Sequence, residues 1–239
     1  MSFDPEQYAE RAALLLMQDT VYISFTSHCD QPPYSGWVMA YNEHTLAQTA
    51  AFNAAPNSGG AGPAIWMAGG GPAADSSGNV YLLTANGGFE TTLNASGFPS
   101  QGDYGNSFLK LSPGTLTVAD YFAMFNEVAE SNADEDLGSG GILLLPDLTD
   151  STNVTRHLAV GAGKDGNLYV VDEFNNDVLR YDGTTGAFLG VFASSGLSDP
   201  ISLVFTPAQA VVPEPSSLTL AGLGVASLIG FARRRKRAA

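Results

Sequence analysis

One pattern of residues recurs three times along the chain and narrows the fold more than any other feature. Each copy begins with a short apolar segment ending in Tyr or Leu, has Thr four residues later, and reaches Phe seven residues after that Thr. The copies span residues 38–52, 108–122 and 178–192. Alternating apolar residues on both sides of a short polar turn are typical of a β-hairpin. The chain is therefore predicted to contain three equivalent hairpins.

A further strand is predicted upstream of each hairpin, at residues 20–25, 78–83 and 166–171. The last two segments begin with Gly-Asn, the end of a turn in which Gly supplies the positive φ angle. The 27 glycines and 13 prolines interrupt the chain too often for long helices. Short strands that repeat in this way predict an all-β fold, a β-propeller. A β-sandwich with similar turns is the alternative, and the three equal spacings favour the propeller.

Several segments resemble the repeats of known propeller families. Gly36-Trp37, Ile65-Trp66 and Gly78-Asn79 are similar to quinoprotein-type repeats, and residues 168–192 resemble an NHL-type blade. The resemblance covers residues 12–207 and implies a partial propeller of about four blades, fewer than these families need to close their ring. The chain would then be a fragment, dimerise, or gain blades from elsewhere, because an open propeller leaves exposed sheet edges.

The C-terminal part combines three features in a fixed order. A proline-containing segment comes first, an uncharged stretch at 218–232 follows, and a basic cluster ends the chain. The prolines keep the first segment extended. The apolar stretch predicts a single hydrophobic helix, shorter than the roughly 20 residues of a comfortable membrane span, and the basic cluster would remain cytoplasmic. The first segment is Val212-Pro213-Glu214-Pro215 and the basic cluster is Arg233-Arg234-Arg235-Lys236-Arg237.

This order resembles the PEP-CTERM sorting signal of bacteria, also catalogued as an ice-binding protein C-terminal domain. An ordinary tail anchor is the alternative. The resemblance implies an exosortase as processing partner, transient anchoring in the inner membrane through 218–232, and delivery to the cell envelope or the extracellular space. The predicted organisation begins with a disordered or truncated terminus at 1–11 and a propeller region at 12–207. A linker with the sorting motif at 208–217, a hydrophobic helix at 218–232 and a basic tail at 233–239 follow.

Charge and cysteine content exclude some functions. Without the basic cluster, five basic residues face 24 acidic ones, a net charge of −19, which argues against a nucleic-acid partner. Cys29 is the single cysteine, so no internal disulfide can form. Residues 1–20 contain no basic segment followed by a long apolar one, so no signal peptide is visible, and we expect a fragment of a longer gene product.

Few residues suggest chemistry. Quinoprotein dehydrogenases hold their cofactor beside a disulfide of adjacent cysteines, so the resemblance does not extend to a cofactor, and none is predicted. His28 is expected to be structural, and Cys29 to be buried. The acidic stretch 127–136 predicts a solvated loop in which Asp134 and Asp136 are candidate calcium ligands. Four aromatic residues suit either sugar stacking or the core, namely Tyr34, Trp37, Tyr41 and Trp66.

The sequence thus predicts an exported surface or matrix protein whose propeller region is a binding or scaffolding module and not an enzyme. Extracellular polysaccharide is the partner that fits such a location. Two alternatives stay open. One is a propeller enzyme that acts on polysaccharide, which would need a clustered acid, base or nucleophile. The other is a truncated remnant of a longer propeller protein.

Overall fold

The computed structural model describes residues 2–57, 62–123, 126–149, 153, 155–157, 159–172 and 177–194, and the account below concerns those residues. The chain divides into two units, Met1–Phe205 and Thr206–Ala239, and all described residues belong to the first. The predicted linker, hydrophobic helix and basic tail lie outside the described residues. Among the helices that are described, none is long and apolar enough to cross a membrane.

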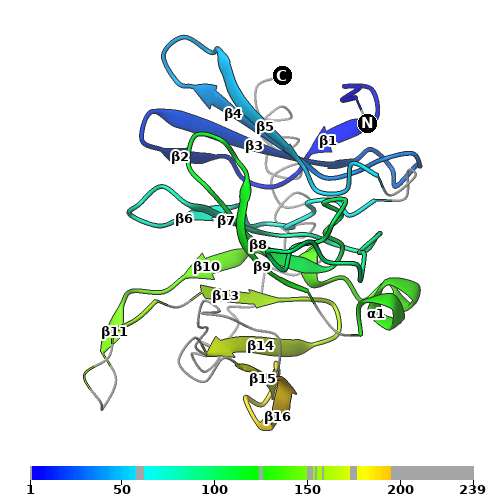
Figure 1. Ribbon diagram of the computed structural model, residues 1–239, viewed down its shortest axis with the longest axis vertical. Coiled ribbons are helices and arrows are strands. Elements are labelled where there is room, and N and C mark those ends of the chain that lie inside the picture. The colour runs from blue at the N-terminus through cyan, green and yellow to red at the C-terminus, as the bar shows by residue number, and fades with distance from the viewer. Residues whose placement is uncertain are drawn as a thin grey trace, which may run out of the picture. The chain divides into compact units, whose positions relative to one another are not determined.

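The described residues form three antiparallel sheets of four or five strands and one sheet of two short strands. The three larger sheets run from blue at the top to yellow at the bottom of Figure 1. The first sheet contains β1 (Tyr8–Glu10), β2 (Leu15–Met17), β3 (Thr20–Ser27), β4 (Trp37–Asn42) and β5 (Gln48–Asn53). The second contains β6 (Ala73–Ala74), β7 (Val80–Leu83), β8 (Ser107–Leu111) and β9 (Val118–Ala123). The third contains β10 (Ile142–Leu144), β13 (Ala159–Ala162), β14 (Asn167–Asp172), β15 (Asp177–Asp182) and β16 (Phe188–Ala193).

The three predicted hairpins are confirmed as β4–β5, β8–β9 and β15–β16. Their turns are closed in the same way, because the N–H of Leu46, Leu116 or Gly186 donates to the carbonyl four residues earlier. The donor residue, Leu46, Leu116 or Gly186, has a positive φ angle in each turn. Each hairpin also has a register shift at the same place, near Tyr41, Leu111 and Tyr181. Equal spacing in sequence therefore reflects equal backbone geometry.

The predicted upstream strands are confirmed as β3, β7 and β14, and each contains a buried tyrosine at the same position. These are Tyr22, Tyr81 and Tyr169, which are 3%, 4% and 2% exposed. In the second and third sheets the phenol donates to an aspartate of the preceding turn, from Tyr81 to Asp75 at 2.9 Å and from Tyr169 to Asp165 at 2.6 Å. These bonds fix the turn to the strand that follows it.

The core consists of two apolar clusters, one on each face of the second sheet. Strand β7 lies between the clusters and is buried along its whole length. Leu82 belongs to the cluster shared with the first sheet, and Leu83 to the cluster shared with the third. Gly161 on β13 allows the close approach of Leu83, because a Cβ atom there would lie 2.8 Å from Leu83 Cδ1. Successive sheets therefore pack face to face, as propeller blades do.

Residues 8–10 form β1, paired with β3, so the disorder expected within 1–11 is wrong for this strand. The solvated acidic loop is also wrong, because Glu127–Ala133 form the helix α1, on which Glu127 and Glu130 are buried. Helix-forming Glu and Ala residues explain it. The described residues contain three blade-like sheets and a separate pair of short strands, β11 (Leu148–Thr149) and β12 (Thr155–Arg156), and the predicted number of about four blades stays a prediction.

Candidate functional site

A cavity of about 360 Å³ is lined by loops of all three sheets. Residues from the β1–β2 and β3–β4 connections meet residues from the segments before β6 and after β7. The third sheet contributes its β13–β14 turn, and the α1 region completes the wall. Such a hollow with aromatic and charged groups is a candidate ligand site. The lining residues are Arg11, Asp30, Tyr34, Trp66, Ala68, Asn86, Asp134, Asp136, Ser139 and Lys164.

A cluster of charges forms one side of the cavity. Lys164 Nζ lies 2.6 Å from Asp136 Oδ2 and 3.0 Å from Asp134 Oδ2. Asn86 joins the same two carboxylates, with its backbone N–H donating to Asp136 and its side-chain amide donating to Asp134. The Asp136 side chain is 6% exposed and that of Asp134 is 78% exposed. The cluster therefore links the second and third sheets and leaves one carboxylate open to solvent.

Lys164 remains a cation in this setting. Partial burial lowers the pKa of its ammonium group, but the hydrogen bonds and charges of Asp136 and Asp134 outweigh burial and hold the pKa above its ordinary value. A base at neutral pH would need the opposite shift. Lys164 is therefore suited to pairing with an anionic group and to donating hydrogen bonds.

Aromatic rings form another part of the wall. The Arg11 guanidinium lies 5.5 Å from the centre of the Trp66 ring, within cation–π range. Tyr34 donates to Asp30 Oδ1 at 2.5 Å. Burial, and then the hydrogen bond to Asp30, raise the pKa of Tyr34 above its ordinary value. The phenol is thus a fixed hydrogen-bond donor at neutral pH.

The other two aromatic candidates lie elsewhere. Trp37 packs against Phe3 with ring centres 5.9 Å apart, and Tyr41 donates to the sulfur of Met39. Only Trp66 and Tyr34, of the four aromatic residues named from the sequence, line this cavity. The cavity thus combines two aromatic groups with donors and acceptors at fixed positions, an arrangement that can bind a polyhydroxylated ligand.

Asp134 and Asp136 come together, with Lys164 as their observed partner, and their role as calcium ligands stays a prediction. Cys29 was expected to be buried and is exposed in the loop after β3, so that expectation is wrong. His28 is also exposed, in the same loop. The sorting motif Val212, Pro213, Glu214 and Pro215 and the basic residues Arg233, Arg234, Arg235, Lys236 and Arg237 lie outside the described residues.

Sequence reasoning missed Arg11, Asn86 and Lys164. A signal for the two cations was present, because only five basic residues precede the basic cluster at the C-terminus. Two of the five lie in this one cavity. Scarce cations among many carboxylates are candidates for specific pairing, and this criterion would have selected all five, Lys164 and Arg11 among them. Asn86 gave no comparable signal.

A second cavity, of about 650 Å³, lies beside the β6–β7 turn. Its aromatic residue, Tyr81, is 4% exposed and donates its hydroxyl to Asp75. Lys110 Nζ lies 5.8 Å from the centre of the Tyr81 ring. The Tyr81 ring is thus buried and offers little surface to a ligand, whereas the side chains of Trp66 and Tyr34 are half-buried. The cavity beside Trp66 is therefore the stronger candidate for ligand binding.

Comparison with solved structures defines the class of fold. The chain is similar to quinohemoprotein alcohol dehydrogenase ADHIIG from Pseudomonas putida HK5, with a TM-score of 0.50 and 16% identity over 77% of this chain and 28% of that one. It is also similar to quinohemoprotein alcohol dehydrogenase from Comamonas testosteroni, with a TM-score of 0.54 and 15% identity over 77% of this chain and 31% of that one. The chain thus shares their fold and spans less than a third of their length.

The family comparison concerns the C-terminal part. Residues 211–236 match the PEP-CTERM protein-sorting motif, so the resemblance stated from the sequence is confirmed. The motif implies an exported protein that is processed by an exosortase and associated with the cell envelope. No curated protein has a sequence that matches this chain.

The structural comparison corrects one conclusion from the sequence. The prediction that the propeller region is not an enzyme is wrong, because the solved structures that share this fold are dehydrogenases. The architecture therefore gives no ground for ruling out catalysis. Identities of 15% and 16% show the fold alone and assign no activity to this chain.

Proposed function

We propose that the chain is an exported protein whose propeller-like region binds a segment of extracellular polysaccharide in the cavity beside Trp66. The sorting motif at residues 211–236 is the observation that carries this proposal, since it implies delivery to the envelope, where such polysaccharide lies. In this proposal the exosortase recognises residues 212–215, the segment that contains Pro-Glu-Pro. The segment 218–232 anchors the precursor in the inner membrane, and the basic tail stays on the cytoplasmic side.

The cavity supports the choice of ligand. The rings of Trp66 and Tyr34 offer apolar surface, and Lys164, Asn86 and Asp134 offer donors and acceptors around it. Sugars have both apolar faces and hydroxyl groups, so they match such a lining. The lining carries three carboxylates, those of Asp30, Asp134 and Asp136, against the two cations Arg11 and Lys164, so the cavity favours neutral sugars over sugars that carry carboxylates.

Export is tested in the host by mass spectrometry. We expect the full chain to lose the residues after the Pro-Glu-Pro segment in cells that have the exosortase and to keep them in a deletion strain. The intact mass of the protein, isolated from membrane and extracellular fractions, measures the difference. An identical mass in both strains would contradict the sorting role.

Binding is tested by affinity electrophoresis of the full chain in gels that contain the host's extracellular polysaccharide. Trp66→Ala and Tyr34→Ala should each weaken binding by about 2- to 10-fold, which corresponds to roughly 0.5–1.5 kcal/mol for an aromatic contact. Phe188→Ala is the matched control, because Phe188 is an exposed aromatic residue on β16, outside the cavity. Retardation that is unchanged in both cavity variants would refute this site.

A further inference from the structure

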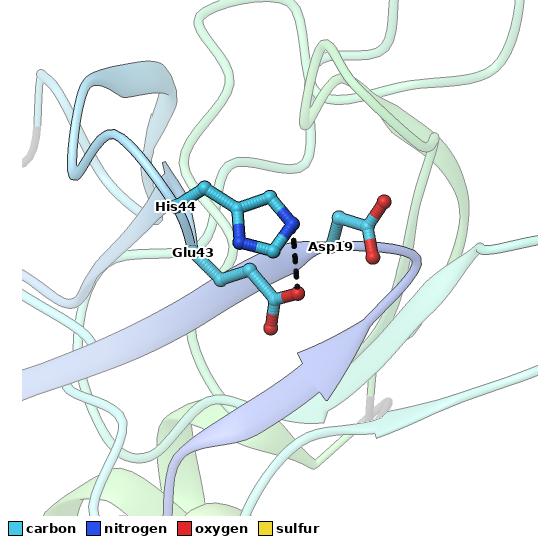
Figure 2. Close-up of side chains that lie close together, drawn as sticks. All are labelled: Asp19, Glu43 and His44. Carbon is cyan, nitrogen blue, oxygen red and sulfur yellow. Dashed lines mark ion pairs between the residues drawn. The ribbon is translucent and has the colours of Figure 1, made fainter.

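Three side chains of metal-binding type lie together at one end of the first sheet. Asp19, Glu43 and His44 each have one ligand atom within 4.8 Å of those of the other two residues. Figure 2 draws the three side chains. Asp19 belongs to the turn between β2 and β3, and the other two residues begin the turn between β4 and β5. His44 Nε2 lies 3.4 Å from Glu43 Oε1. None of the three lines the cavity beside Trp66.

The backbone already holds the two turns in place. The N–H of Glu43 donates to the carbonyl of Asp19 at 2.9 Å, which joins the two turns directly. The N–H of His44 donates to Asn42 Oδ1 at 3.2 Å. A ligand would therefore need to order side chains but not the loops that carry them, which reduces the entropic cost of binding.

Comparison with the other two sheets shows that the hairpin itself does not require these residues. The position of Asp19, three residues before the buried tyrosine, is occupied by Gly78 and Gly166. The φ angle there is positive in all three sheets, at 58°, 86° and 71°. Glycine adopts this region freely, and aspartate and asparagine are the other residues that tolerate it. The first sheet therefore has an aspartate where the other two sheets have glycine.

The same holds for the partner turn. Glu43 corresponds to Pro113 and Gly183, and His44 corresponds to Gly114 and Thr184. Only the first sheet, among the three described, carries an imidazole and two carboxylates at these positions. The His44 side chain is 72% exposed and that of Glu43 is 27% exposed, so water has access to the site.

We propose that Asp19, Glu43 and His44 bind a divalent first-row transition-metal ion, with one imidazole nitrogen and two carboxylate oxygens as protein ligands and water at the remaining positions. Imidazole together with carboxylate suits zinc and its neighbours, whereas calcium prefers six to eight oxygen ligands. Ligand atoms around a tetrahedral zinc ion lie about 3.4 Å apart, for ligand distances of about 2.1 Å. Rotation of exposed side chains can close the present spacing to that value.

Isothermal titration of the EDTA-treated full chain with Zn²⁺ tests the site. The titration is made in a Cys29→Ser background, because the exposed thiol of Cys29 is itself a zinc ligand. We expect one equivalent of Zn²⁺ to bind. His44→Ala and Asp19→Asn should each weaken binding at least about tenfold, since loss of an outer-sphere partner alone typically costs 10- to 100-fold.

His157→Ala is the matched control. His157 is an exposed histidine paired with a single carboxylate, with Nδ1 2.7 Å from Asp147 Oδ1. This variant should bind Zn²⁺ as tightly as its parent. Unchanged binding in both His44→Ala and Asp19→Asn would overturn the site, and so would loss of Zn²⁺ binding on replacing Cys29 alone. Displacement of Zn²⁺ by equimolar Ca²⁺ would overturn the choice of metal. Because the sites share no residue, failure here leaves polysaccharide binding untouched.

Discussion

The first and third sheets are built on the same frame but use their carboxylates differently. Both contain the repeated hairpin and a buried tyrosine on the strand before it. In the third sheet Asp165 accepts hydrogen bonds from Asn167 and Tyr169 and so stabilises its own turn. In the first sheet Asp19 and Glu43 lie at the surface beside His44. The two sheets therefore share the hairpin, the strand before it and the buried tyrosine, while the side chains in their turns differ.

The two sheets also differ in how they attach to the second sheet. Among the residues whose burial is described, the cluster toward the first sheet contains twelve and the cluster toward the third contains seven. The third sheet has in addition the ion pairs of Lys164 with Asp134 and Asp136. Polar links thus supplement the apolar contact with the third sheet, and they lie at the wall of the proposed binding cavity.

The largest expected effect comes from the strand between the two clusters. Leu82 and Leu83 are adjacent on β7, fully buried, and belong to opposite clusters. Leu82→Ala and Leu83→Ala should each lower the free energy of unfolding by about 2–5 kcal/mol, because each leaves a cavity in a packed interface. Urea denaturation measures this loss. Hydrogen exchange should then increase mainly in the first sheet for Leu82→Ala and mainly in the third for Leu83→Ala.

Leu143→Ala serves as the control for that pair. Leu143 lies on β10 and is 58% exposed, so its replacement should change the free energy of unfolding by no more than about 0.5 kcal/mol. Faster exchange in the same sheet for both buried variants would show that the two clusters do not act as separate interfaces.

The repeated elements could be predicted from the sequence because their signals are local. The spacing from Tyr or Leu to Thr and on to Phe predicted three hairpins, and the alternation of apolar residues predicted the strands before them. The α1 helix could not be predicted in this way, because seven residues are too few for a clear helical period. The exposure of Cys29 could not be predicted for another reason, since it depends on the loop after β3, in which Cys29 has a positive φ angle.

The candidate sites depend on contacts between distant segments, which spacing does not reveal. Arg11 meets Trp66, and Lys164 meets Asp134, only after the sheets have packed against one another. The acidic stretch 127–136 stands out in the sequence, but nothing in it indicates that Lys164 pairs with Asp134 and Asp136. Likewise, nothing in the local sequence indicates that Asp19 lies beside His44, because pairing of β2 with β3 and of β3 with β4 brings the two turns together. Short-range patterns therefore predict the frame better than the sites.

A smaller effect distinguishes the two sheets at the buried tyrosine. Tyr169→Phe removes a hydrogen bond to a carboxylate and should lower the free energy of unfolding by about 1–2 kcal/mol at pH 7. Tyr22→Phe, at the same position of the first sheet, should cost less, because burial raises the pKa of Tyr22 without a carboxylate partner. Urea denaturation of both variants beside the parent protein makes the comparison.

The pH dependence sharpens this test. Burial, and then the hydrogen bond to Asp165, raise the pKa of Tyr169 above the value of about 10 for a free tyrosine. The folded state thus keeps a proton that the unfolded chain loses, so this contribution is fully present below about pH 10 and declines as the pH rises further. The difference in stability between the parent and Tyr169→Phe should therefore narrow between pH 9 and pH 11, roughly one unit either side of that value. A difference that stays constant or widens would mean that Tyr169 does not hold its proton, and the turn of the third sheet would then owe its order to Asn167 and the backbone.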